Sequence, residues 1–480
     1  MIRAKMLIGG VLCDAADGAE LPTVNPATGR PLGVAPDAGP EDIRRAVDAA
    51  HAAWPAWAGL SVDARAAAMR KLAAAVRGRA DEIARVEVQD TGNLLAPMLS
   101  DVLRAADRLE FYAGLGHAVM GATYPATPTH VHLSLREPFG VVARIVAFNH
   151  PFYFALSRMG APLITGNCVI VKTPDQAPLS GGILAELAAE HLPAGVASVL
   201  SGTGARCGDA IVREPRIKRI GFIGSVETAQ RIQRSAAEVG VKHITHELGG
   251  KNMMIVLPDA DVEKAASLAI EGMNFQWQGQ SCGSTSILAL HEDIHDAVLA
   301  RVRARMRAIR PGDPFDPSTG MGPLISEAHH AKITAAIARG RASGAEILEG
   351  GGRPAGAMFA KGFWVEPTLF GGVTANNALA RDEFFGPVLS VLRWRDEGEL
   401  IAIDDASSLG LTASIVGRDV GAALGLGRRL RVGYVWINCV GPHYVGVPYG
   451  GMKNSGVGRE EGIEELLSYT EIKAISIASG

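Results

Sequence analysis

The chain has 480 residues, of which 48% are hydrophobic and 20% are charged, and its formal net charge is -3. This length exceeds what one hydrophobic core usually supports, so two or three domains are expected. The near-neutral charge and the lack of a basic stripe argue against nucleic acid as a partner. No apolar run reaches the length of about 18 residues that a membrane span requires, so none is expected.

Cysteine usage indicates a reducing, cytoplasmic location. The chain has five cysteines, an odd number, and no two of them form a C-x-x-C pair. A long chain with this usage is unlike a disulfide framework. The N-terminal stretch MIRAKMLIGGVLCDAADG turns polar at Asp14 without an apolar run of signal-peptide length.

In chain order, residues 40–118 are rich in Ala and Arg with helical periodicity, and Pro40 before an acidic turn marks a helix start. From about 136 to 247, short apolar runs alternate with helical stretches such as APLSGGILAELAAEHL. The runs are GVVARIVAF, CVIVK, ASVL and IKRIGFIG. Such alternation predicts a parallel, doubly wound sheet.

The alternation repeats more loosely from 248 to about 454. MMIVL, SILAL and SIVG have the character of strands, and DVEKAASLAIEGMN, HDAVLARVRARMRAI and SEAHHAKITAAIARGRASG that of helices. Two pieces fit neither sheet: TYPATPTHVHLSLREP (123–138), whose prolines suit an exposed edge, and EIKAISIA near the C-terminus. They form either one small sheet that reaches a second subunit or two unrelated edge strands.

HEDIH, residues 291–295, has the spelling of the zinc motif H-E-x-x-H, in which both histidines share one face of a helix. Here His291 follows directly on the strand run SILAL, whereas Asp293 and Asp296 suit a helix N-terminus. If Asp293 caps the helix, His291 lies outside it and the motif loses its geometry. We therefore predict no metal site.

Cys282, in NFQWQGQSCGSTS, is the candidate nucleophile. The flanking Ser281 and Gly283 are small, as suits a thiol that a substrate must reach. The alternative is a buried structural cysteine, which the other four cysteines fit better, although Cys207 lies in a glycine-rich turn. A thiol nucleophile also needs a base or a lowered pKa.

A candidate base and a candidate oxyanion donor lie upstream. Glu247, in THELGGKN, stands between two apolar blocks, and the glycine pair behind it lets the backbone approach another group closely. Asn149, in VAFNHPFYFAL, lies where a strand ends and a helix begins, and its amide can donate to a developing negative charge. The alternatives are a solvated surface charge and an ordinary turn asparagine.

Two glycine signals suggest a nucleotide site. Gly204 is the middle glycine of SGTGARCG, whose spacing is one residue off the G-x-G-x-x-G fingerprint. Gly224 and Ser225 lie between a strand and a helix, where backbone amides can hold a phosphate. Lys172 ends the strand run VIVK, and with Asp175 it could bind ribose hydroxyls.

Together these motifs resemble the NAD(P)-dependent aldehyde dehydrogenase superfamily. Eight blocks match in the family's order: FNHP, VKTPD, GFIGSVETAQ, HELGGKN, GQSCGS, EFFGPVLSV, VWIN and PYGGMKNSGVGREEG. The hydrolytic, non-CoA-acylating branch is the closer match because Glu247 is present. The resemblance implies oxidation of a small-molecule aldehyde to the acid by a homodimer or homotetramer.

The resemblance also implies a three-part fold. Its parts are a Rossmann-like coenzyme domain (1–122 and 137–247, with a return segment at about 455–466), a catalytic domain (248–454) and a small β oligomerisation arm (123–136 and 467–480).

By resemblance, Cys282 is the nucleophile, Asn149 and the Cys282 N–H form the oxyanion hole, Glu247 activates the deacylating water, and Glu460 relays protons. The implied cofactor-binding residues are Phe148, Lys172, Asp175, Gly204, Gly224, Ser225, Leu248, Glu383 and Phe385. Among them, Glu383 and Phe385 position the nicotinamide half, Lys172 and Asp175 hold the adenosine ribose, and Ser225 contacts the pyrophosphate. The implied substrate pocket consists of His150, Tyr153, Ser157, Ser281, Gly283, His443 and Tyr449.

The sequence departs from the family pattern at a few of these positions. Asp175 stands where NAD-preferring members usually carry glutamate, so NAD is the expected cofactor with NADP left open. His150 and His443 stand where aromatic residues are common, and with Tyr449 they suggest a polar tunnel mouth. Polar aliphatic aldehydes, aromatic aldehydes and semialdehydes all remain open as substrates. The rival functions are a CoA-acylating semialdehyde dehydrogenase, a zinc hydrolase on HEDIH and a non-catalytic nucleotide-binding protein.

Overall fold

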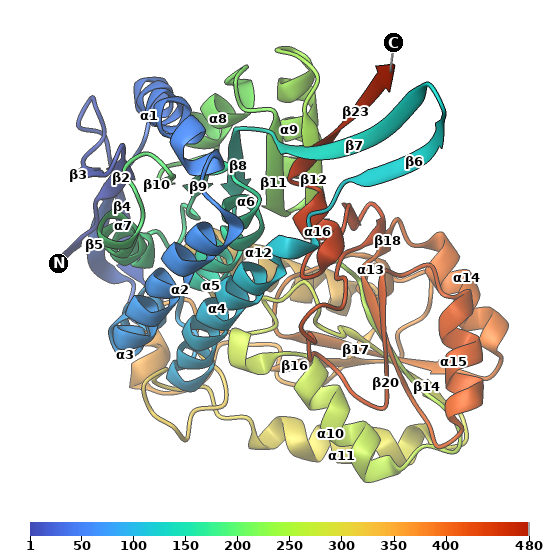
Figure 1. The fold of residues 1–480 in the computed structure, drawn as a ribbon. Coiled ribbons are helices and arrows are strands. Elements are labelled where there is room, and N and C mark those ends of the chain that lie inside the picture. The colour runs from blue at the N-terminus through green and yellow to red at the C-terminus, as the bar shows by residue number, and fades with distance from the viewer. Residues whose placement is uncertain (479–480) are drawn as a thin grey trace.

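Two large β-sheets, each built mainly by a consecutive part of the chain, organise the molecule, and a narrow β arm extends from them (Figure 1). The computed structural model describes residues 1–478. Its parallel sheets alternate with helices, which confirms the predicted α/β class.

The first sheet has the strand order β22-β12-β11-β8-β9-β10-β2-β3. Its strands are β2 (Met6–Ile8), β3 (Val11–Cys13), β8 (Val141–Ile145), β9 (Cys168–Lys172), β10 (Ala197–Leu200), β11 (Arg219–Gly224), β12 (His243–Leu248) and β22 (Gly456–Val457). Strands β8 to β12 pair in parallel, and β8, β9 and β10 are buried along their whole length. Continuous apolar runs are typical of a parallel sheet covered on both faces, so the four predicted strands are confirmed.

The order in which the chain adds parallel strands to this sheet reverses between β8 and β11. It runs from β8 outward through β9 to β10 and then adds β11 and β12 on the other side of β8. Open α/β sheets bind ligands at the carboxyl ends of their strands at such a switch point. Predicted site residues lie in the last two positions of these strands or in the segments that follow them: Asn149, Lys172, Ser225 and Glu247.

Two groups of helices cover the first sheet. The helices of this part are α1 (Pro40–Ala58), α2 (Val62–Gly78), α3 (Ala80–Thr91), α4 (Leu95–Leu115), η1 (Gly116–Ala118), α5 (Pro151–Ser157), α6 (Gly160–Ile164), α7 (Leu179–His191), η2 (Gly204–Gly208), α8 (Asp209–Arg213), α9 (Val226–Ala237) and α16 (Ile463–Leu467). One group consists of α1, α8 and α9, and the other places α5, α6 and α7 between the strands and the outer helices α2 to α4. Helix α1 starts at Pro40 as predicted.

The second sheet has the strand order β15-β16-β17-β14-β13-β19-β20, with only β15 antiparallel to its neighbour among the described strands. Its strands are β13 (Met253–Val256), β14 (Ile287–His291), β15 (Glu346–Glu349), β16 (Thr368–Gly371), β17 (Val388–Trp394), β19 (Thr412–Val416) and β20 (Tyr434–Ile437). Its helices are α10 (Val262–Gly272), η3 (Phe275–Trp277), α11 (His295–Ala308), α12 (Glu327–Ala342), η4 (Ala357–Ala360), α13 (Ala378–Arg381), α14 (Glu397–Ala406) and α15 (Val420–Arg429).

The alternation of side chains along β13 gives the second sheet two cores. Met254 and Val256 pack with residues of α10 and α11, whereas Met253 and Ile255 pack with residues of α14 and α15. Successive side chains of a strand point to opposite faces, so one apolar run serves both layers. The predicted strands MMIVL, SILAL and SIVG are confirmed as β13, β14 and β19.

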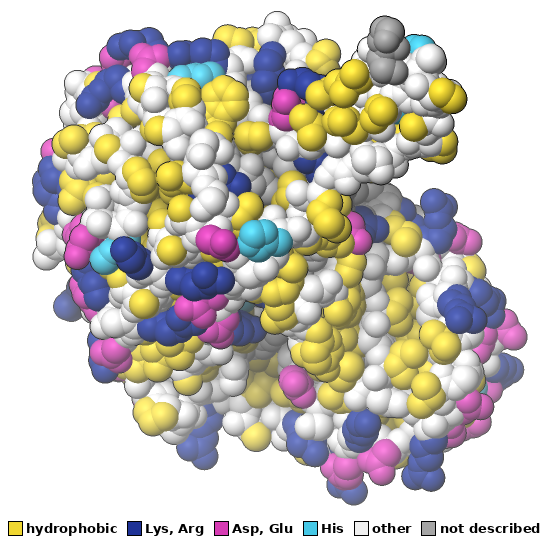
Figure 2. All heavy atoms as spheres, viewed as in Figure 1, with side chains coloured by type: hydrophobic (Ala, Val, Ile, Leu, Met, Phe, Trp, Pro, Cys, Tyr) yellow, Lys and Arg dark blue, Asp and Glu magenta, His cyan; other side chains and the backbone are white. Residues whose placement is uncertain are grey.

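The arm is a sheet of order β23-β7-β6, built from β6 (Ala122–Thr127), β7 (His130–Pro138) and β23 (Thr470–Ala478). Strand β23 pairs antiparallel with β7 from Thr470–Pro138 to Ala478–His130, so the two pieces left over in the sequence form one sheet. Hydrophobic side chains gather over it at the upper right of Figure 2. The exposed ones include Tyr124, Val131, Leu135, Ile472 and Ile477. The last two residues of the predicted arm, 479 and 480, lie outside the described residues.

Smaller pairings complete the fold. Strands β1 (Ile2–Arg3), β4 (Glu20–Asn25) and β5 (Arg30–Pro36) form an N-terminal sheet that the sequence did not predict. Strand β18 (Leu409–Gly410) pairs with β21 (Met452–Lys453), and β22 then joins the first sheet beside β12. The chain therefore passes back from the second sheet to the first near residue 455. Within residues 1–478, no helix combines the length and apolar character needed to cross a bilayer.

Candidate active site

Cys282 lies on the loop between η3 and β14, and this loop is tied to the connection between β12 and β13. Asn274 and Gln278, on either side of η3, both have a positive φ, which lets the chain turn tightly. The side-chain amide of Asn252 donates to the carbonyl oxygens of Cys282 (2.6 Å) and Ser284 (3.0 Å). These bonds hold the backbone that carries the thiol.

Glu247 lies beside this thiol at the end of β12. It is 4% exposed, and its Oε1 has no hydrogen-bond partner among residues 1–478. Burial raises the pKa of Glu247 to about 8, and the charge of Glu460 adds to the effect. Burial and the Glu247 carboxyl likewise raise the pKa of the Cys282 thiol well above its ordinary value. Both groups therefore favour their neutral forms in the free protein.

The two glycines after Glu247 make room for other polar groups. A Cβ on Gly249 would lie 1.9 Å from Glu383 Oε2, and a Cβ on Gly250 would lie 2.2 Å from Asn252 Oδ1. The N–H of Gly250 donates to Glu383 Oε1 (2.9 Å), and burial raises the pKa of Glu383 to about 6. Only glycine permits this close approach, so the two glycines of LGG make it possible for the Glu383 carboxyl group to lie against this backbone.

Phe148 and Phe385, both predicted cofactor-binding residues, contact each other edge to face with ring centroids 5.7 Å apart. Phe385 has a φ of 60°, which is uncommon for a bulky residue. Its carbonyl oxygen accepts a hydrogen bond from Nε2 of His329 (2.7 Å). His329 was not predicted, because its place on α12 looks like an ordinary helical position in the sequence.

Asn149 lies in the turn between β8 and α5 and is 3% exposed. Nδ2 of Asn93 donates to the carbonyl oxygen of Asn149 (3.1 Å), and Nε2 of Gln278 donates to that of Gly92 (3.4 Å). The loop between α3 and α4 therefore connects the Asn149 turn to the segment that leads to Cys282. Asn93 and Gln278 lack a local motif that could have singled them out.

The predicted ribose residues lie after β9. Lys172 ends this strand with a buried side chain, and its Nζ donates to the Thr173 carbonyl (3.0 Å). Asp175 follows in the next bend and is half-buried. A buried ammonium group at a strand end, with a carboxylate three residues later, suits polyhydroxylated ligands.

The remaining predicted cofactor residues lie along the same edge of the first sheet. Ser225 caps α9, with its Oγ accepting from the Thr228 N–H (3.3 Å), and Gly224 ends β11 immediately before it. Leu248 ends β12, and Gly204 begins η2 with no atom within 4 Å of the position of a Cβ. A helix N-terminus, an open glycine and a buried lysine at a switch point fit a dinucleotide.

A cavity of about 990 Å³ opens beside Cys282 and Glu247. Its lining includes the predicted residues His150, Tyr153, Ser281, Gly283, His443 and Tyr449. Ser157, the seventh predicted pocket residue, does not line it. Ser157 is the last residue of α5, its side chain is buried in the interior, and its hydroxyl has no hydrogen-bond partner in the described chain.

Two histidine–carboxylate pairs border this cavity. Nδ1 of His150 lies 2.6 Å from Asp101 Oδ2, and Nδ1 of His443 lies 3.1 Å from Glu461 Oε2. The carboxylates accept from Nδ1, so each ring keeps Nε2 for a ligand, and neither Nε2 has a partner within residues 1–478. Asp101 and Glu461 were not predicted.

Glu460 belongs to a buried ion cluster behind the cavity, defined as Arg144, Arg158, Glu460, Glu461 and Glu465. Glu460 pairs with Arg144 (2.6 Å) and Arg158 (3.0 Å), and Arg158 also pairs with Glu461 (3.2 Å) and Glu465 (3.5 Å). Burial opposes ionisation, but the two arginines lower the pKa of Glu460 below its ordinary value. The signal for this cluster was Arg144 inside the apolar run GVVARIVAF, because a buried charge requires a partner.

HEDIH is a strand-to-helix junction. His291 is the last residue of β14, and α11 begins only at His295, so the two histidines do not share a helical face. The predicted cap is wrong in detail: Ile294, not Asp293, occupies the N-cap position, and no side chain caps the helix. Glu292 pairs with Arg395 (2.6 Å). No group of three or more potential metal ligands occurs among residues 1–478.

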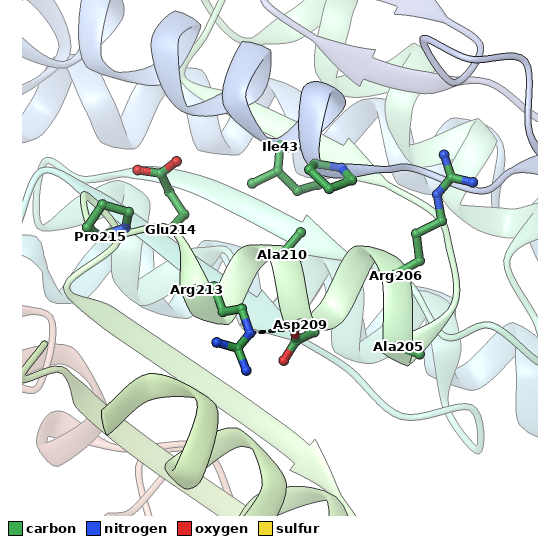
Figure 3. A pocket seen from close by; sticks show the side chains of 9 residues that line it. Ile43, Ala205, Arg206, Asp209, Ala210, Arg213, Glu214 and Pro215 are labelled. Carbon is green, nitrogen blue, oxygen red and sulfur yellow. Dashed lines mark hydrogen bonds and ion pairs between the residues drawn. The ribbon is translucent and has the colours of Figure 1, made fainter. Parts of the chain in front are cut away.

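A second hollow of about 570 Å³ lies between the first turn of α1 and the segment η2–α8 (Figure 3). Its charged side chains are paired with neighbours, Arg213 with Asp209 (2.6 Å) and Arg206 with Asp17. None of the predicted site residues lines it. The hollow is therefore separate from the candidate active site.

Comparisons with known proteins agree on the family. The model of the aldehyde dehydrogenase family matches residues 13–475. The aldehyde dehydrogenase tropH of Talaromyces stipitatus is 46% identical over 465 residues, which cover 95% of this chain and 90% of that protein. An NAD+ complex of an aldehyde dehydrogenase from Bacillus cereus is 34% identical, with a TM-score of 0.96 over 99% of this chain and 96% of that one. A 3,6-anhydro-L-galactose dehydrogenase solved in complex with NAP is 30% identical, with a TM-score of 0.96 over 99% of this chain and 100% of that one. The chain therefore belongs to the aldehyde dehydrogenase family and is an NAD(P)-dependent aldehyde dehydrogenase.

Proposed function

We propose that Cys282 is the nucleophile of this dehydrogenase and Glu247 its deacylating base. The observation that carries the proposal is their position: a thiol and a buried carboxyl lie side by side in the lining of one large cavity, and Asn252 holds the backbone that carries the thiol. A carboxyl with a pKa of about 8 is a suitable base near neutral pH. This is the hydrolytic reaction, with water as the acceptor of the acyl group.

The chemistry follows from these positions. Glu247 takes the proton of the Cys282 thiol and passes it to solvent, and the sulfur then attacks the aldehyde carbon. The electron pair of the carbonyl moves onto oxygen, and this oxyanion accepts hydrogen bonds from the Asn149 amide and the Cys282 N–H. Bound NAD(P)+ supplies the hydride acceptor. Glu247 then takes a proton from the water that attacks the thioester carbon, and the carbon–sulfur bond breaks to release the acid and the thiol.

Glu460 has a different role in this proposal from the proton relay expected by resemblance. Its two arginine partners keep it ionised, and a carboxylate that is held ionised is a poor carrier of protons. It acts instead through its charge, which helps to keep the pKa of Glu247 high. Glu460 is thus a positioning residue.

The proposed cofactor residues divide between the two halves of a dinucleotide. Lys172 and Asp175 would hold the adenosine ribose, and the amides after Ser225 would hold the pyrophosphate. The second half would lie between Glu383 and the aromatic pair Phe148 and Phe385. Because the Asp175 carboxylate would repel a phosphate on the ribose, NAD is the proposed preference over NADP.

For the substrate, the proposal is a planar aldehyde, aromatic or conjugated, with a hydrogen-bonding substituent. Aromatic rings in the lining of the cavity form two contacting groups, one with Tyr153, Phe154 and Trp277 around His150, the other with Trp436, His443 and Tyr449. The free Nε2 atoms of His150 and His443 suit a hydroxyl or amide substituent on such a ring.

The arm and the cysteines carry two further parts of the proposal. The exposed apolar residues of β6, β7 and β23 suit a partner copy, so a homodimer or homotetramer is proposed.

All five cysteines are free, and burial raises the pKa of Cys168 and Cys207 to about 12, which suits structural thiols in a reduced, cytoplasmic setting.

A panel of aldehydes assayed by the absorbance of the reduced cofactor tests the function. The expected kcat/KM is higher for hydroxybenzaldehydes than for straight-chain aldehydes of equal size, NAD is preferred to NADP, and Cys282→Ser abolishes turnover. Undiminished oxidation by Cys282→Ser overturns the assignment of the nucleophile. CoA in the assay should neither accelerate product formation nor yield an acyl-CoA.

A further inference from the structure

We infer that Tyr449 is a catalytic residue whose hydroxyl donates a hydrogen bond to the Cys282 thiolate. The inference rests on the proposed role of Cys282 and adds to it a group that stabilises the nucleophile. The Tyr449 hydroxyl oxygen lies 3.8 Å from Cys282 Sγ, within reach of a hydrogen bond to sulfur. Within residues 1–478, the thiol is the only hydrogen-bond partner that this hydroxyl has.

The ring of Tyr449 is held firmly. Its side chain is 2% exposed and packs with Leu411 and Trp436. The His443 ring lies against it, with centroids 4.1 Å apart and planes 31° from parallel. His443 is itself fixed by the Glu461 carboxylate, so the packing behind the phenol extends to the buried ion cluster.

The backbone at this position is equally constrained. Tyr449 and Glu460 exchange two hydrogen bonds, from Tyr449 N to Glu460 O (2.8 Å) and from Glu460 N to Tyr449 O (2.7 Å). On the other side, a Cβ on Gly283 would lie 3.5 Å from the Tyr449 hydroxyl. The hydroxyl is therefore confined beside the nucleophile loop, and a preorganised donor needs little reorganisation when charge forms on sulfur.

The charges around the thiol explain why such a donor matters. The titratable groups that act on Cys282 are Glu247 from β12, Tyr449, and more weakly Glu383 from the segment before β17. Both carboxylates oppose a thiolate. Burial and the nearby Cys282 and Glu247 raise the pKa of Tyr449 well above its ordinary value, so its hydroxyl keeps the proton that it donates. Tyr449 is thus the neighbour that favours the thiolate.

Tyr449→Phe tests the inference, because it removes the hydroxyl and keeps the ring. The measurement is the rate of iodoacetamide alkylation of Cys282 against pH in the free enzyme, followed by mass spectrometry of the Cys282 peptide. Loss of one hydrogen bond to a charged sulfur should raise the apparent pKa by about one unit and slow alkylation at neutral pH about tenfold. At pH values above both transitions, the two proteins should react at the same limiting rate, which shows that the variant is folded and its thiol accessible.

Tyr434→Phe is the matched control. Its ring centroid lies 5.8 Å from that of Tyr449, but its side chain does not line the cavity, so its alkylation profile should match that of the wild type. Turnover of an aldehyde should fall about tenfold in Tyr449→Phe and remain unchanged in Tyr434→Phe. Superimposable alkylation profiles for wild type and Tyr449→Phe would overturn the inference and leave the role of Cys282 intact. Full activity of Cys282→Ser would instead overturn the proposed nucleophile.

Discussion

Two buried regions of the molecule lie next to each other and treat their carboxyl groups in opposite ways. At the nucleophile, Glu247 lies beside Cys282 without a hydrogen-bond partner for Oε1 in the described chain, and burial raises its pKa to about 8. In the ion cluster, Glu460 lies between Arg144 and Arg158 and has a lowered pKa. Both carboxyl groups are nearly inaccessible, at 4% and 5% exposure.

Burial alone therefore does not decide the charge of a carboxyl group; the partners supplied by the fold do. The cluster shows how an interior can hold several charges when each carboxylate lies within ion-pair distance of an arginine. Among the described residues no arginine pairs with Glu247, so its pKa stays close to the pH at which a general base works, where the carboxyl can both release and take up a proton. The following variants test this contrast.

The largest effect is expected for Glu247→Gln. Glutamine keeps the shape but cannot take a proton from water, so hydrolysis of the thioester should slow by a factor on the order of 10²–10⁴. Rapid mixing should show one burst of reduced cofactor per active site, and mass spectrometry should find the acyl group on Cys282. An undiminished steady-state rate would argue against the base role.

A large loss of stability is expected for Arg158→Met in the ion cluster. Removal of the arginine leaves Glu460, Glu461 and Glu465 with fewer positive partners, and breaking a buried ion network costs about 3–5 kcal/mol. Denaturant unfolding measures the change. The control is Arg77→Met, which removes a half-exposed pair with Glu110 and should cost about 0–1 kcal/mol. Equal losses in the two variants would contradict the contrast between buried and exposed pairs.

A smaller effect on folding stability is expected for the Glu247 carboxyl group. Its replacement should stabilise the protein, whereas Arg158→Met should destabilise it. Its pKa is about 8 in the folded protein against an ordinary value of 4.5, so the folded state binds the proton more tightly. Below pH 4.5 both states are protonated; between 4.5 and about 8 only the unfolded chain loses the proton, so wild-type stability falls as pH rises. The slope is at most about 1.4 kcal/mol per pH unit.

Glu247→Gln removes this loss. In a Cys282→Ala background, which eliminates the thiol titration, the variant should gain stability relative to Glu247 as the pH rises from 5 to 8. Free energies of unfolding at several pH values measure the difference. A difference independent of pH would show that the carboxyl is not held in its neutral form.

The predictability of these two regions from sequence differs for a physical reason. Cys282 and Glu247 could be predicted from their local sequence, because small residues flank Cys282 and Glu247 is a charged residue between two apolar blocks. The ion cluster depends on contacts between distant segments: Arg158 and Glu461 are 303 positions apart and become neighbours only when the chain returns to the first sheet. Only Arg144, inside an apolar strand, gave a local hint.

The fold divides in the same way. The central strands of both sheets, β8 to β11 in the first and β13, β14 and β19 in the second, were predicted because buried strands of a parallel sheet are continuous apolar runs. The N-terminal strands β1, β4 and β5 were missed because β1 is very short and β4 and β5 mix polar and apolar residues, so their pairing rather than their composition makes them strands. The pairing of β23 with β7 could be stated only as one of two alternatives, since it joins two pieces, Thr470–Ala478 and His130–Pro138, that lie far apart in the sequence.

The smallest effect is expected at Glu292, the glutamate of HEDIH, which supplies a third environment for the comparison. Its partner Arg395 lowers its pKa through an ion pair at the protein surface, where water screens the interaction. Glu292→Gln should leave turnover and zinc content unchanged. It should remove only the small stabilisation that the exposed ion pair contributes above the ordinary pKa of the carboxyl group and that is lost as the pH falls through its lowered pKa. Metal analysis and the pH series used for Glu247 check the expectation. If Glu292→Gln instead shifted the pH profile of stability as strongly as Glu247→Gln, a surface carboxyl group would affect stability as much as a buried one. That result would contradict the assignment of the Glu247 effect to burial.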